Sequence, residues 1–159
     1  MKLDKKNCMI LDLLQKDCRM SLTKIGVKVD LSVDSVKKRI NRMKENKIFY
    51  SKIQLRPRNF GFQNVVDIKI KFHNHTMQLF NKFVDTMYAN PHVIEMFSVA
   101  GVWDFSIIVI AKDAHHLGEM SSSIRTEFSE LIQDWSESLT TRAYKFEKYD
   151  MMKINEEIK

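Results

Sequence analysis

The spacing of the apolar residues changes from one pattern to another near Pro57 and Gly61. Before this point apolar side chains recur every three or four positions, as they do on one face of a helix. After it, the stretch from Val65 to Phe72 ends in an alternation of apolar and polar residues, which is typical of a half-buried strand. A chain of 159 residues has room for one medium domain or two small ones. We therefore expect two domains, one helical and one built on a sheet.

The charged residues divide at the same place. Residues 1–58 contain 16 Lys and Arg against 6 Asp and Glu, a net charge of +10. Residues 59–159 contain 10 against 14, a net charge of −4, so that the whole chain carries +6. A strongly basic first domain attached to a slightly acidic second one indicates a protein that binds a polyanion through its first domain.

The composition excludes several classes of protein. With 44% apolar and 29% charged residues, the chain is neither disordered nor low in complexity. Its longest apolar run, Ile107–Ala111, is far shorter than the ~20 residues of a membrane helix, and its charged first six residues are unlike a signal peptide. Cys8 and Cys18 are too few for a disulfide scaffold and lack zinc-type spacing, so we expect a core thiol and an exposed one. We expect a cytoplasmic protein, associated with the nucleoid if the polyanion is DNA.

Capping residues and helical spacing predict three helices in the first domain. Each capping side chain stands directly before an apolar stripe, where its oxygen accepts a hydrogen bond from the first turn. The caps Asp4, Ser21 and Ser32 begin predicted helices over about residues 4–16, 22–29 and 33–45.

The third predicted helix has the properties of a recognition helix. Val36, Ile40 and Met43 form one inward stripe, and the opposite face is basic and polar. A basic run on an isolated helix is more often a solvated face, but the caps, the stripe and the regional charge favour a helix-turn-helix domain that places this helix in the major groove of double-stranded DNA. We expect Ser35 and Lys38 to reach base edges. The full set of predicted DNA contacts is Ser21, Ser32, Asp34, Ser35, Lys37, Lys38, Arg39 and Arg42, with Arg39 and Arg42 placed for phosphates.

The second half of the chain alternates between strand and helix patterns. The order strand–helix–strand–strand–helix–strand predicts a ferredoxin-like βαββαβ domain with helices on one face of an antiparallel sheet. We expect strands over residues 65–72, 93–99, 105–111 and about 136–146, helices over about 77–90 and 114–128, a turn over 100–104, and a frayed polar tail over 151–159.

This order of elements and several motifs together resemble the Lrp/AsnC (feast/famine) family of transcription regulators over about residues 3–150. The turn Val99-Ala100-Gly101-Val102-Trp103-Asp104 is similar to the family's Gly-x-Tyr-Asp turn, with Trp103 in place of Tyr. The motifs of the first half are Leu3-Asp4, Asp17-x-Arg19-x-Ser21, Val29-x-Leu31-Ser32, Val36-x-x-Arg39-Ile40, Met43, Ile48, Pro57 and Phe60-Gly61.

The resemblance implies an α+β protein with an N-terminal (winged) helix-turn-helix domain over residues 1–50, a linker strand or hinge over 51–62, a ferredoxin-like dimerisation and effector domain over 63–150 and a tail over 151–159. It implies that a homodimer, or a tetramer or octamer of the chain, binds a pseudo-palindromic operator. It also implies that an amino acid binds at Gly101, Val102, Trp103 and Asp104, the alternative being that these residues only make a hairpin turn.

Where relatives commonly have glycine or another small residue, this chain has Asp30 and Asn46, which tolerate the left-handed conformation that ends a helix. The pairs His73/His75 and His115/His116 lack the third ligand of a metal site, so we expect no metal and no cofactor. We expect no enzyme activity. Two alternatives stay open: an enzyme like the sirohaem decarboxylases, which share this architecture, and an architectural DNA-binding protein without an effector.

Overall fold

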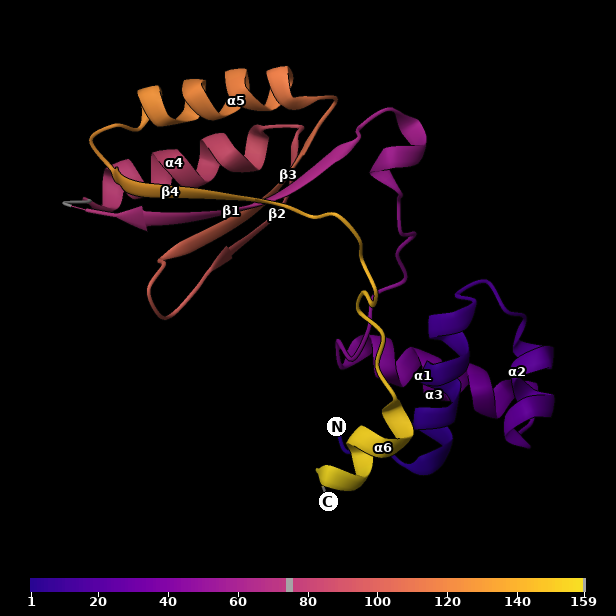
Figure 1. Ribbon diagram of the computed structural model, residues 1–159. Helices are drawn as coiled ribbons and strands as arrows, with labels where there is room; N and C mark the ends of the chain where they lie inside the picture. The colour runs from indigo at the N-terminus through magenta and orange to yellow at the C-terminus, as the bar shows by residue number, and fades with distance from the viewer. Residues whose placement is uncertain (74–75, 159) are drawn as a thin grey trace. The chain divides into compact units, whose positions relative to one another are not determined.

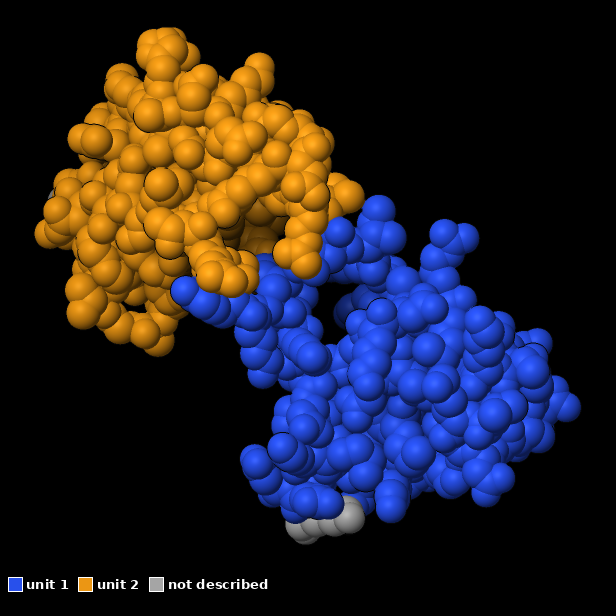
Figure 2. All heavy atoms as spheres, turned by 45° about the vertical axis from the view of Figure 1, so that its right-hand side comes forward, with its two compact units in different colours: residues 1–54, 144–159 blue, residues 55–143 orange. Residues whose placement is uncertain are grey.

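The computed structural model describes residues 1–73 and 76–158 (Figure 1). The chain forms two compact units, one made of residues 1–54 and 144–159 and the other of residues 55–143 (Figure 2). The first unit is helical and the second is built on a four-stranded antiparallel sheet, so the α+β fold class expected from the sequence is confirmed.

Three capped helices form the basis of the first unit: α1 (Lys5–Lys16), α2 (Leu22–Val29) and α3 (Val33–Glu45). Their caps are the three residues expected, because the side chains of Asp4, Ser21 and Ser32 accept hydrogen bonds from the backbone of the following turn. The apolar faces of these helices meet in one core. Its buried members are Ile10, Leu11, Ile25, Val29, Val36, Ile40 and Met43.

The turn between α2 and α3 is tight because of two residues. Asp30 adopts the expected left-handed conformation, with φ of 53°, at the end of α2. Gly26 lies under the turn, and a Cβ at this position would stand 2.6 Å from the backbone oxygen of Leu31. Only glycine fits this approach, so Gly26 fixes how closely the start of α3 follows α2.

The segment after α3 differs from expectation. Asn46 has an ordinary φ of −83°, and Lys47, with φ of 55°, takes the left-handed conformation instead. Residues 46–56 contain no strand, so the expected wing and linker strand are not formed. The next element is a short 3-10 helix, η1 (Pro57–Phe60), which ends at Gly61, whose φ is +104°. Residues 52–56 alternate between polar and apolar side chains, but no strand of the described residues pairs with them, and pairing is what stabilises a strand.

The prediction of a frayed tail is wrong for residues 151–157, which form helix α6 (Met151–Glu157). Helix α6 packs against α1 within the first unit, and Met151 contacts the helical core. The side-chain amide of Gln15 pairs with the backbone of Tyr149, donating to its oxygen at 3.1 Å and accepting from its nitrogen at 2.8 Å. Asp12 accepts from the backbone nitrogen of Met151 at 3.1 Å. These contacts hold the tail on α1.

The second unit follows the expected βαββαβ order. Its strands form a sheet in the order β2-β3-β1-β4 with antiparallel neighbours, and both helices cover the same face of this sheet (Figure 1). The buried core between them includes Ile68, Phe83, Ile107 and Phe128. The elements are β1 (Asn64–Phe72), α4 (Met77–Ala89), β2 (Val93–Ser98), β3 (Phe105–Ala111), α5 (Ala114–Glu127) and β4 (Ile132–Leu139).

The last strand, expected over residues 136–146, begins and ends earlier. Strand β1 sets its length, because Ile132 pairs with Phe72 at one end and Leu139 with Val66 at the other. One further hydrogen bond joins the Thr140 nitrogen to the Val65 oxygen, and the chain then leaves the sheet. The expected continuation to residue 146 is not formed, because among the described residues no strand pairs with residues 141–146.

Candidate nucleic-acid interface and ligand turn

One face of α3 brings together most of the predicted DNA contacts. Ser35, Lys38, Arg39 and Arg42 stand three or four positions apart, so they lie along the same side of the helix. Together with the start of the chain they line an open hollow of about 370 Å³, whose other lining residues are Met1, Lys2, Asp4 and Asn7. The arrangement gives a basic, solvent-facing surface with polar groups at its centre.

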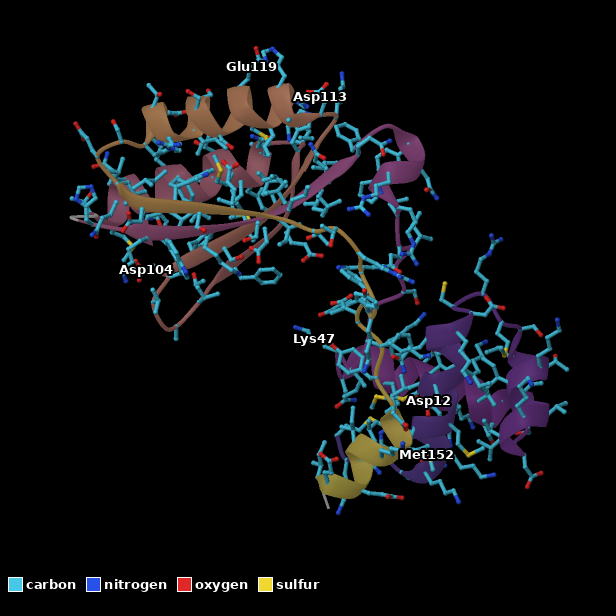
Figure 3. All side chains as sticks on the ribbon, in the orientation of Figure 1. Asp12, Lys47, Asp104, Asp113, Glu119 and Met152 are labelled. Carbon is cyan, nitrogen blue, oxygen red and sulfur yellow. The ribbon has the colours of Figure 1, made fainter. Side chains whose placement is uncertain are left out.

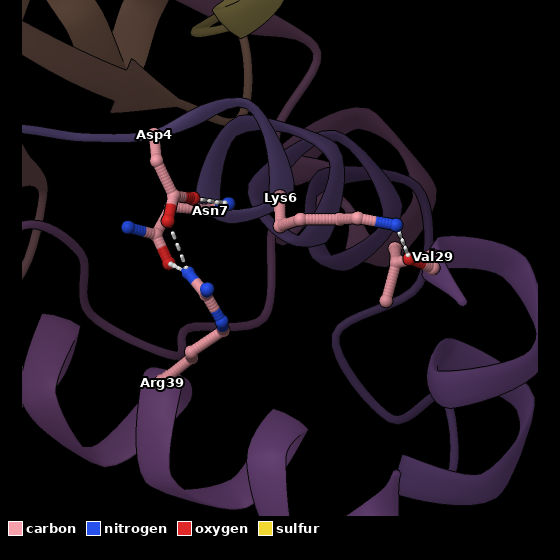
Figure 4. Close-up of polar contacts among 5 residues, drawn as sticks. All are labelled: Asp4, Lys6, Asn7, Val29 and Arg39. Carbon is pink, nitrogen blue, oxygen red and sulfur yellow. Dashed lines mark hydrogen bonds and ion pairs between the residues drawn. The ribbon is translucent and has the colours of Figure 1, made fainter. Parts of the chain in front are cut away.

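Arg39 is held at this surface by the first turn of α1 (Figure 4). Its Nη1 donates to Asp4 Oδ2 at 2.6 Å and to Asn7 Oδ1 at 2.8 Å. Lys6, from the same turn, donates to the backbone oxygen of Val29 at the end of α2. The first turn of α1 therefore fixes both helices of the helix-turn-helix motif.

The electrostatics of Asp4 agree with this geometry. Partial burial raises the pKa of its carboxyl group. The hydrogen bonds from Arg39 and the Asn7 backbone, together with the Arg39 charge, lower the pKa by more than burial raises it, so the pKa lies below the ordinary 3.8. Asp4 is therefore ionised at neutral pH and paired with Arg39.

The other predicted DNA contacts occupy the edges of this surface. Ser21 and Ser32 cap α2 and α3, and the Ser32 hydroxyl donates to the Ser35 hydroxyl at 2.9 Å. Helix N-termini attract anions, so the start of α3 can face a phosphate. Asp34 and Lys37 are exposed on α3 but do not line the hollow.

Sequence reasoning missed three residues at this site: Lys2, Asn7 and Gly26. Lys2 lines the hollow, Asn7 binds Arg39 while only 4% exposed, and Gly26 sets the turn. Gly26 had a signal, since a glycine inside a helical pattern indicates close packing. Lys2 and Asn7 had none, because only the fold brings the start of α1 beside α3.

The second predicted site is the turn between β2 and β3, where Asp104 is labelled in Figure 3. Asp104 Oδ1 lies 2.9 Å from Lys71 Nζ, and Oδ2 accepts from the backbone nitrogen of Phe72 at 2.9 Å. Gly101 has a φ of +142°, and a Cβ there would meet nothing within 4 Å. Val102 is 80% exposed. Backbone and open space are therefore available at the turn, whereas the Asp104 carboxylate already has partners.

The histidines form contacts of their own. His116 Nδ1 accepts from the Lys112 nitrogen at 3.2 Å, its ring centroid lies 4.7 Å from that of His92, and His115 pairs with Glu119. Burial, followed by the charges of His116 and Lys112, lowers the pKa of His92 below its ordinary 6.5. His73 is exposed, and the prediction for His75 lies outside the described residues.

Within residues 1–73 and 76–158 there is no group of three or more His, Cys, Asp or Glu residues that could hold a metal ion. Cys8 is buried and Cys18 exposed, as expected. In the same residues no helix is both long enough and apolar enough to cross a membrane.

Comparison with known proteins assigns both units. Residues 3–44 match the AsnC-type helix-turn-helix domain, and residues 65–145 match the Lrp/AsnC ligand binding domain. An HTH-type transcriptional regulator of Pyrococcus horikoshii is 34% identical over 118 residues, 73% of each chain. The DNA-binding transcriptional activator DecR of Escherichia coli is 29% identical over 118 residues, 74% of this chain and 78% of DecR.

Solved structures agree on the fold. A transcriptional regulator from Neisseria meningitidis, solved as a complex with L-Met, is similar with a TM-score of 0.83 and 19% identity, covering 91% of this chain and 93% of the other. Escherichia coli AsnC is similar with a TM-score of 0.80 and 16% identity, covering 93% and 98%. The two domain matches and the Pyrococcus relative together show that this chain belongs to the Lrp/AsnC family of transcriptional regulators.

Proposed function

We propose that the protein regulates transcription by binding a specific DNA sequence through the face of α3 that carries Ser35, Lys38 and Arg42. The observation that carries this proposal is the hollow where these side chains meet Lys2 and the start of α1. The surface is basic, faces solvent and lies on the second helix of a helix-turn-helix motif, which is the geometry of a helix that enters the major groove.

The side chains on this face differ in what they can recognise. Lys38 is exposed near the N-terminal half of α3, the part of such helices that reaches base edges, and a lysine can donate to guanine oxygen and nitrogen atoms. Arg42, one turn later, is placed for a phosphate. Ser35 accepts from Ser32 and keeps its own hydroxyl proton for a base.

The test begins with selection of bound duplexes from a random library, followed by affinity measurements on the selected duplex and on random DNA. Lys38→Ala should weaken binding to the selected duplex by ~1–3 kcal/mol and to random DNA much less. Arg42→Ala should weaken both by similar factors and reduce the salt slope by about one. Lys16→Ala, at the exposed end of α1, is the matched control and should change neither.

Equal losses on both DNAs for Lys38→Ala would refute its base-reading role. A wild-type protein that binds random and selected DNA equally would favour the architectural alternative. A purified protein that binds haem would favour the sirohaem decarboxylase alternative over the non-enzymatic regulator proposed here.

We further propose that an amino acid regulates the protein from the turn Gly101–Asp104. The open space over Gly101 and the exposed Val102 support this, because a ligand can approach the backbone there. Trp103 leaves less room than a Tyr, which favours small or flat ligands. Thermal-shift measurements with each of the twenty amino acids test the proposal, and a flat response throughout would contradict it.

We also propose that the chain works as a homodimer, or as a tetramer or octamer, at the chromosome in the cytoplasm. In support, α4 and α5 cover only one face of the sheet (Figure 1). In addition, Phe97 on β2 is 50% exposed. Light scattering of the purified protein with and without operator DNA measures the assembly. A monomer that binds DNA with full affinity would contradict this part of the proposal.

A further inference from the structure

The guanidinium group of Arg39 is restrained at one nitrogen and open at the other two. Its Nη1 has two protons, and the two acceptors Asp4 Oδ2 and Asn7 Oδ1 take both. Among the described residues, Nε and Nη2 make no hydrogen bond, and the side chain is 31% exposed. The free edge formed by Nε and Nη2 is the one that binds a phosphate with two parallel hydrogen bonds.

Both acceptors are themselves fixed. Asp4 caps α1, since its Oδ1 accepts from the backbone nitrogen of Asn7 at 2.8 Å. Asn7 is only 4% exposed, so its side-chain amide has few alternatives to Arg39. Arg39 is thus held by groups that cannot easily move, which lowers the entropy that its side chain loses on binding a ligand.

The restrained guanidinium lies on the surface proposed to bind DNA, because Arg39, Asp4 and Asn7 all line the hollow that also contains Lys38 and Arg42. We propose that Asp4 and Asn7 are positioning residues, which hold Arg39 so that its Nε and Nη2 bind one DNA phosphate. This inference rests on the proposed function of α3. It assigns a role in DNA binding to a carboxylate that caps α1 and whose negative charge by itself disfavours DNA binding.

The direction in which one substitution changes the DNA affinity distinguishes this inference from an effect of charge alone. Asp4→Asn removes a negative charge from a DNA-binding surface, and charge alone therefore predicts tighter binding. Asparagine also caps helices well, so the start of α1 is retained. If Asp4 positions Arg39, the same substitution weakens binding, because the guanidinium is no longer held by an ion pair.

The experiment measures the affinity of the full chain for the selected duplex by fluorescence anisotropy at several salt concentrations. We expect Asp4→Asn to bind about 3- to 10-fold more weakly, the range for losing the restraint on one long side chain, with a salt slope lower by up to about one. Asp17→Asn removes the same charge at the other end of α1 and should leave the affinity unchanged or slightly tighter. Unchanged or tighter binding by Asp4→Asn overturns the inference.

Two further variants allow the inference to be tested even if Asp4→Asn lowers the stability of the folded protein. In an Arg39→Ala background, Asp4→Asn should cause no additional loss, since there is no guanidinium left to position. Arg39→Lys keeps the charge but lacks the two-nitrogen edge, so it should bind nearly as weakly as Arg39→Ala. Wild-type affinity for Arg39→Lys would refute the two-bond phosphate contact. Suppose that Asp4→Asn leaves DNA binding intact. If Lys38→Ala and Arg42→Ala leave it intact as well, the proposed function of α3 is wrong. If Lys38→Ala and Arg42→Ala weaken DNA binding, only the positioning role of Asp4 is wrong.

Discussion

Replacing Gly26 by alanine should weaken the helical unit, although alanine is the better helix former. A Cβ at Gly26 would lie 2.6 Å from the backbone oxygen of Leu31, closer than the 3.0 Å below which real Cβ contacts essentially never occur. Leu31 cannot retreat easily, because its backbone nitrogen donates to the Gly26 oxygen at 3.0 Å. The added methyl group must therefore push the start of α3 away from α2.

The expected size follows from two opposing terms. Overpacking a close contact costs ~1–3 kcal/mol, and a contact with backbone belongs in the upper part of this range. Alanine recovers ~0.8–1 kcal/mol of helix propensity. A net loss of about 1–2 kcal/mol lowers the melting temperature of a unit of this size by about 4–16 °C.

Calorimetry of the full chain measures this shift, and the operator affinity should fall as well, because α3 is displaced. Gly118→Ala in α5 is the matched control, since nothing lies within 4 Å of a Cβ there. This control should raise stability by about 0.5–1 kcal/mol. If Gly26→Ala were as stable as wild type, or more so, the argument from the close approach would be wrong.

Two other substitutions test residues of the sheet unit. The neutral form of His92 should contribute its full stabilisation of the sheet unit above pH 6.5, and this contribution should be lost as the pH falls from 6.5 towards the lowered pKa of the folded state. The melting temperature of His92→Gln should therefore depend less on pH over this range than that of the wild type. An equal pH dependence in the two proteins would contradict the assignment. Asp104→Ala should lower the stability of the same unit by ~1–3 kcal/mol, because the Phe72 nitrogen loses its acceptor. It should also abolish any amino-acid response while leaving ligand-free DNA affinity nearly intact, and an amino-acid response that survives would remove Asp104 from the ligand site.

Local chemistry made the helix starts predictable. Asp4, Ser21 and Ser32 each act on a backbone nitrogen three residues ahead, so the sequence contains both partners of each contact. The limits of β4 were not predictable in this way, because they depend on the ends of β1: Ile132 pairs with Phe72, 60 residues earlier, and Leu139 pairs with Val66, 73 residues earlier.

The site shows the same division between local and distant causes. The basic face of α3 follows from helical spacing, and Lys38 and Arg42 are exposed as expected. Arg39 has the same charge and the same helix, but its partners Asp4 and Asn7 lie 35 and 32 positions away. No spacing rule connects them, so sequence reasoning assigned Arg39 only to phosphate and assigned Asp4 only to the helix cap.

The contact between α1 and α6 has a consequence for the order of events during synthesis. Gln15 pairs with Tyr149, which the ribosome adds 134 residues later, on the order of ten seconds at ordinary rates of translation. Throughout that interval the three N-terminal helices can fold while α1 still lacks its last neighbour, because the last strand of the sheet unit, β4, is itself completed only ten residues before Tyr149. The helical unit thus receives its last segment only at the end of synthesis, although most of its sequence is translated first.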